Sequence, residues 1–124
     1  MHVDWVRRYC MSLPHVTEQV QWESLVFKIG GRMFALAALE PHEHGISHCM
    51  TLKCSAESFA ELVERPGIVP APYLARAHWV ALESFDAIAR PELERMLSRA
   101  YEMVFAKLPK KAQAELRKPP KTKR

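Results

Sequence analysis

Long apolar runs, cysteines and glycines are all scarce in this chain, and each scarcity argues against a class of protein. No apolar run approaches the ~20 residues that a membrane-spanning helix requires. The first ten residues, MHVDWVRRYC, lack the apolar stretch of a secretory signal, so we expect a cytoplasmic protein. Only three cysteines occur, Cys10, Cys49 and Cys54, and none forms a CxxC pair. This odd count predicts neither a disulfide framework nor a zinc site.

Motifs of catalysis are also missing. The four glycines form no phosphate-binding loop, and neither GxSxG nor HExxH occurs. A nucleophilic enzyme needs a serine or cysteine beside a histidine and an orienting carboxylate. Cys10 and Cys54 instead fall on apolar faces of their segments, which favours a role as small core residues. We therefore expect neither enzymatic activity nor a cofactor.

The composition is that of an ordinary globular protein with an uneven distribution of charge. Of the 124 residues, 48% are hydrophobic and 26% are charged, which predicts one domain, residues 1–116, with a substantial core. The formal net charge is +4, but residues 107–124 hold eight lysines and arginines against one glutamate, a net of +7. The remainder, with ten positive and thirteen negative residues, carries −3. The segment 117–124 is interpreted as a basic, disordered tail.

Gly30 and Gly31 give the clearest local signal, because a glycine pair tolerates the positive φ angles of a tight hairpin turn. We expect strands at 24–29 and 32–39 on either side. With a two-residue loop, Phe27 would pair with Phe34 and Leu25 with Leu36 on the core face. Lys28 would pair with Met33, and Val26 with Ala35, on the opposite face.

The spacing of apolar residues predicts the other helices and strands. Helices are expected over 2–13, over 56–65 with Ser55 as the N-cap, and from Pro91 to 108, followed by a short helical turn. Further strands are expected within 46–54 and at 78–82. The predicted order is α-β-β-β-α-β-α. This order indicates an α+β fold in which helices pack on one face of an antiparallel sheet, while the other face is open to solvent or a partner.

The open face carries the candidate binding residues. Strand alternation places Lys28, Lys53 and Trp79 there, with Tyr73 and Arg76 on the preceding loop. Lysines can follow a phosphate backbone and an indole can stack on a base, although aromatic residues more often serve packing, which by itself favours an inward-facing Trp79. Lys110 and Lys111 of the basic C-terminal segment complete the predicted DNA-binding set.

The segment EPHEHGISHC, residues 40–49, concentrates side chains that ligate transition metals. His42 and His44 fall in a loop, and His48 and Cys49 are successive strand residues that point to opposite faces. No spacing of a metal motif is met. We therefore expect adventitious metal capture at most.

Five separated segments resemble, in order and spacing, the MmcQ/YjbR-like family of small bacterial proteins. They are YCMSLPHVTE, LVFKIGGRMFAL, TLKCSAE, PGIVPAPYLARAHWVAL and AYEMVFAKLPKKAQAEL, within residues 3–116. The resemblance implies an α+β fold related to the frataxin-like architecture and a double-wing arrangement described as DNA-binding. It favours a DNA-binding protein that contacts phosphates weakly and non-specifically, without catalysis and without a membrane partner, as a monomer or weak homodimer. The alternative is a protein-interaction or frataxin-like metal-handling module.

Overall fold

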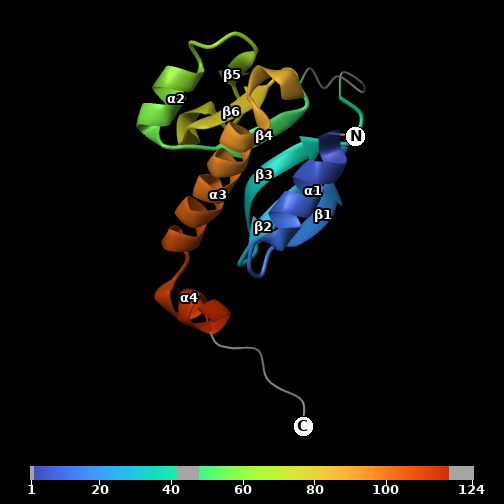
Figure 1. Cartoon of the computed structure of the whole chain (residues 1–124). Coiled ribbons are helices and arrows are strands. Elements are labelled where there is room, and N and C mark those ends of the chain that lie inside the picture. The colour runs from blue at the N-terminus through green and yellow to red at the C-terminus, as the bar shows by residue number, and fades with distance from the viewer. Residues whose placement is uncertain (1, 42–47, 118–124) are drawn as a thin grey trace.

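An antiparallel sheet covered by helices on one face organises residues 2–41 and 48–117, the part of the chain that the computed structural model describes (Figure 1). Six strands follow the order β1-β2-β3-β4-β6-β5. They are β1 (Thr17–Gln21), β2 (Ser24–Ile29), β3 (Arg32–Ala38), β4 (Met50–Lys53), β5 (Ile68–Pro70) and β6 (Trp79–Leu82). The helices are α1 (His2–Ser12), α2 (Ala56–Leu62), α3 (Arg90–Lys107) and α4 (Lys110–Arg117). The predicted α+β class, with helices on one face of an antiparallel sheet, is confirmed.

The helices form where their apolar spacing and end signals predict them. On α3, Leu93, Leu97, Ala100 and Val104 recur three or four residues apart and are buried against the sheet. Ser55 is the N-cap of α2, since its side chain accepts a hydrogen bond of 3.1 Å from the Ser58 N–H. No helix within the described ranges is long and apolar enough to cross a membrane.

Two edge strands were missed by the sequence prediction, so the order α-β-β-β-α-β-α is incomplete. Strand β1, TEQVQ, has a mostly exposed and polar sequence because only its inner edge pairs, with β2. Strand β5 contains Pro70, which an edge strand tolerates because the missing N–H costs no hydrogen bond within the sheet. The sequence pattern predicts no strand in either segment.

A bulge shifts the register of the central hairpin, so the predicted pairing holds only near the turn. Lys28 pairs with Met33 as expected, but Phe27 pairs with Ala35 rather than with Phe34. Phe34 is therefore the extra residue on β3. The bulge moves the remainder of β3 by one position: Ala35 joins the main core, and Leu36 lies in a second cluster on the other face.

The second sheet face is partly covered, which corrects the expectation that it is open. Trp79 and Ala81 of β6 are buried there together with Ala71. Leu74 of the loop between β5 and β6 packs on the same cluster, and a 3₁₀ turn, η1 (Ala75–Ala77), follows it. Strand alternation predicted the face on which Trp79 lies, but it could not predict that a loop folds back over that face.

Gly30 fixes the end of α3 against the β2–β3 turn. Its φ of +61° lies in the left-handed region that glycine adopts without strain, and an added Cβ would approach a Leu108 methyl to 2.6 Å. Leu108 is itself buried at the junction of α3 and α4. The last residue of α4, Arg117, falls within the segment 117–124 that the sequence predicts to be a disordered tail. Its guanidinium instead lies 4.9 Å from the centre of the Phe105 ring, a cation–π contact that favours the helical position.

Candidate functional site

Two segments that carry positive residues meet where the β2–β3 turn contacts the α3–α4 junction. The contact between Gly30 and Leu108 places the two segments side by side, at the lower end of the hairpin and of α3 in Figure 1. We call this surface the basic end. Its cations from the two segments are Lys28, Arg32, Lys107, Lys110 and Lys111.

Lys53 joins the basic end from β4. Because Ala35 pairs with Leu52 in the antiparallel β3–β4 ladder, the last residue of β4 lies beside the start of β3. Burial, with a further contribution from the positive charge of Lys107, lowers the pKa of Lys53. The Lys53 Nζ donates a hydrogen bond of 2.9 Å to the carbonyl of Ala77. This bond places Arg76, the preceding residue, at the border of the same surface.

Most of these cations have no acidic partner in the described ranges. Lys28 donates to the neutral side chain of Gln19 at 2.9 Å. Glu18, which lies near this end on β1, forms its ion pair with Arg7, and that hydrogen bond lowers its pKa. No carboxylate of the described residues forms an ion pair with Lys107, Lys110 or Lys111. Their charge is thus available to an external anion.

The residues predicted to bind DNA therefore fall into two groups, those at or beside the basic end and those away from it. Lys28, Lys53, Lys110 and Lys111 lie at the basic end and Arg76 lies beside it, whereas Trp79 is only 5% exposed and offers no free ring face. Tyr73 is fully exposed, at a positive φ of 66°, on the loop that precedes η1. The prediction missed Arg32 as a site residue. Its position one residue after the glycine turn was a usable signal.

The predicted histidine loop falls almost wholly outside the described residues. His42 and His44 belong to the undescribed segment, whereas His48 is described. Within 2–41 and 48–117, no three histidine, cysteine, aspartate or glutamate side chains gather closely enough to hold a metal ion.

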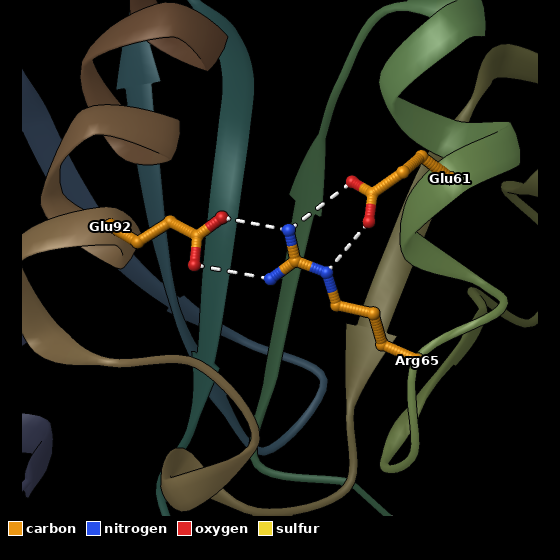
Figure 2. Close-up of polar contacts among 3 residues, drawn as sticks. All are labelled: Glu61, Arg65 and Glu92. Carbon is orange, nitrogen blue, oxygen red and sulfur yellow. Dashed lines mark hydrogen bonds and ion pairs between the residues drawn. The ribbon is translucent and has the colours of Figure 1, made fainter.

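A groove of about 560 Å³ runs between α2 and α3. An ion-pair bridge crosses it near the start of α3: Arg65 donates to Glu61 of α2 at 2.8 Å and to Glu92 of α3 at 3.0 and 3.1 Å (Figure 2). Hydrogen bonding to Arg65 lowers the pKa of Glu92. Both carboxylates in this part of the groove therefore have an internal cation as partner.

Three cations line the same groove. Arg95 and Arg99 lie one helical turn apart on α3, and Lys53 enters from the end of β4. Leu62, Met96 and Met103 supply apolar surface between them. Arg95 and Arg99 were not predicted as site residues, although their spacing of four residues within a predicted helix indicates a shared face.

The three cysteines are buried free thiols, as predicted for Cys10 and Cys54. Burial raises the pKa of Cys10 and of Cys49 to about 12 and that of Cys54 to about 11. The thiols are therefore protonated and unreactive near neutral pH, since the thiolate is the nucleophile.

These thiols should make the protein less stable in alkali. Their pKa values are higher in the folded than in the unfolded state, so their contribution is complete below pH 9 and is lost as the pH rises towards 12. The free energy of unfolding, measured by urea titration, should fall over this range. In the Cys10→Ala variant the free energy of unfolding should fall less steeply with pH than in the unmodified protein, by up to about 1.4 kcal/mol per pH unit. Parallel curves for the two proteins would contradict the assignment.

The fold and the site define a small α+β protein with helices on one face of an antiparallel sheet and cations gathered at one end. The chain belongs to the YjbR family, whose model matches residues 11–103. The crystal structure of a Deinococcus radiodurans protein with a DUF419 domain is similar at a TM-score of 0.77 and 29% identity, covering 94% of this chain and 88% of that one. A Pseudomonas syringae protein shares the fold at a TM-score of 0.66 and 20% identity, with 83% and 98% covered. No protein with a curated description matches the chain.

Proposed function

We propose that this YjbR-family protein binds DNA non-specifically through backbone phosphates, without catalysis, as a cytoplasmic monomer or weak dimer. The proposal rests on the basic end, where the contact of Gly30 with Leu108 and the β3–β4 pairing bring together segments that carry six cations. They are Lys28, Arg32, Lys53, Lys107, Lys110 and Lys111. Segments that are distant in sequence supply these charges, so the folded chain concentrates them.

The chemistry of the basic end favours phosphates over base edges. Each lysine that neutralises a phosphate releases condensed counterions, and this supplies affinity without sequence preference. Base stacking would need a free aromatic face, and Trp79 is buried among its neighbours. The exposed Tyr73 lies on the adjoining loop and can add a contact at the border.

Loss of two lysines from the basic end tests the proposal. Lys110→Ala/Lys111→Ala should weaken binding to a fluorescent duplex about tenfold at physiological salt. The slope of log affinity against log salt should become shallower by about 2, because two phosphate contacts disappear. Fluorescence anisotropy at several salt concentrations measures both quantities.

The matched control removes two positive charges elsewhere. Arg8 lies on α1, and Arg90 lies at the opposite end of α3 from Lys107. If the basic end is the site, Arg8→Ala/Arg90→Ala should bind DNA within about twofold of the unmodified chain. Equal losses in both double variants would show that net charge alone attracts DNA, and the site assignment would then be wrong.

A protein-interaction role is the second candidate, supported by the β1–β2 turn. Val20 and Trp22 are 63% and 65% exposed there, and Leu39 is 41% exposed. The Leu39 N–H donates to the carbonyl of Glu23, which brings Leu39 beside the turn. If the unmodified chain fails to bind duplex DNA at physiological salt, this exposed apolar surface becomes the better candidate.

A further inference from the structure

We propose that the α2–α3 groove binds a small organic anion, a carboxylate or phosphate ester that carries an apolar body. This proposal does not depend on DNA binding, although Lys53 belongs to both surfaces. A volume of about 560 Å³ lies within the range of small-molecule sites. The groove is lined by both helices, so it is an intramolecular site rather than a flat surface.

Acidic and basic side chains occupy different parts of the groove. The lining residues of α3 run from Glu92 to Ala106 on one helical face, a length of about 20 Å at 1.5 Å per residue. Glu92 begins this face, and it shares Arg65 with Glu61 across the groove (Figure 2). Arg65 lies 35% exposed between the two carboxylates and offsets one of their two negative charges, and the positive charge of Arg95 also helps to lower the pKa of Glu92.

The remaining charged residues of the lining carry a net positive charge. Arg95 and Arg99 form no ion pair with any described carboxylate. Their side chains lie one turn apart, and two guanidinium groups at this spacing can together hold a single carboxylate or phosphate. Lys53 adds a third positive charge, held in place by the Ala77 carbonyl. The one further acid of the lining, Glu102, does not offset three cations.

The apolar part of the lining specifies the rest of the ligand. Met96 and Met103 are half-buried on the α3 side, and Leu62 is buried on the α2 side. Methionine side chains adapt to ligands of varied outline, and the apolar contact adds affinity that a bare phosphate ion would lack. An anion with an aromatic or aliphatic body therefore matches the groove better than inorganic phosphate does.

Anilinonaphthalene sulfonate, which joins an anionic group to an apolar body, is the probe for this site. Its fluorescence should rise with saturable binding to the unmodified chain. Arg95→Gln/Arg99→Gln should weaken that binding at least about tenfold, while Arg8→Gln/Arg90→Gln leaves it unchanged. The uncharged N-phenylnaphthylamine should bind the groove variant and the unmodified chain alike, because only the charge differs.

A second variant tests the cavity rather than the charge. Ser58 lines the α2 side, so Ser58→Phe should occupy the groove and exclude the probe while the fold, checked by circular dichroism, is kept. Amide chemical-shift changes caused by the probe should centre on Ser58, Arg95 and Arg99. Unchanged affinity in the arginine variant, or shifts centred on Tyr101 and Leu116 at the separate α3–α4 cavity, would overturn the proposal. Neither result bears on binding of DNA by the basic end.

Discussion

Replacing Phe34 with alanine should lower the free energy of unfolding by about 3–5 kcal/mol, as is typical when a large core aromatic is truncated. Phe34 is completely buried in the main core. Its ring lies edge-on to Tyr101 of α3 at 5.7 Å between centres, a contact that adds about 0.5–1.5 kcal/mol beyond burial. The variant would therefore lose core volume and also weaken the packing of α3 against the sheet.

Tyr73→Ala is the matched control, since it also replaces an aromatic side chain with a methyl group. Tyr73 is fully exposed, so its loss should change stability by less than about 0.5 kcal/mol. Urea unfolding followed by circular dichroism would measure both variants. A Phe34→Ala loss below about 1 kcal/mol would contradict the inward placement of the bulged residue.

The bulge at Phe34 could not be predicted from the alternation of apolar and polar residues. The glycine pair and the alternation of β2 predicted the hairpin, and Lys28 does pair with Met33. Alternation assumes a regular ladder, however, and one inserted residue reverses the facing of every position beyond it. Leu36 therefore faces the second cluster rather than the main core. No composition signal in the segment marked that insertion.

The candidate site was predictable only in part, because local sequence patterns do not encode contacts between distant segments. Residue type and strand position were enough to nominate Lys28 and Lys53, and the basic C-terminal segment was enough to nominate Lys110. What joins them is the packing of Gly30 against Leu108, a contact between residues 78 positions apart that no local pattern encodes. Burial of Trp79 likewise depends on a loop that folds over the sheet, so its facing was predictable and its accessibility was not.

Truncation after Leu116 should cause the larger loss of DNA affinity. It removes five of the eighteen positive residues, Arg117, Lys118, Lys121, Lys123 and Arg124, and no acid. If each contributes roughly one phosphate contact, the log–log salt slope becomes shallower by about 4 and affinity falls about 100-fold at physiological salt. Lys107, Lys110 and Lys111 remain, so residual binding should still respond to their substitution.

The truncated chain should stay folded, because Arg117, the one described residue that is removed, is exposed and its side chain makes a contact with a ring. That contact is the Arg117 guanidinium over the Phe105 ring, which stabilises the protein by about 0.5–1 kcal/mol at an exposed site. Leu116, which packs on the core, is retained. Thermal unfolding of the truncated and full chains would verify this before any binding is measured.

A full-length variant separates charge from chain length. Lys118→Gln/Lys121→Gln/Lys123→Gln/Arg124→Gln keeps every residue position and the Arg117 contact, yet removes four charges. Its loss of affinity should approach that of the truncation, since counterion release depends on charge. If both chains instead bind duplex as tightly as the unmodified protein, and Lys53→Ala or Arg76→Ala abolishes binding, the attraction comes from the end of the sheet and the C-terminal charges have no part in it.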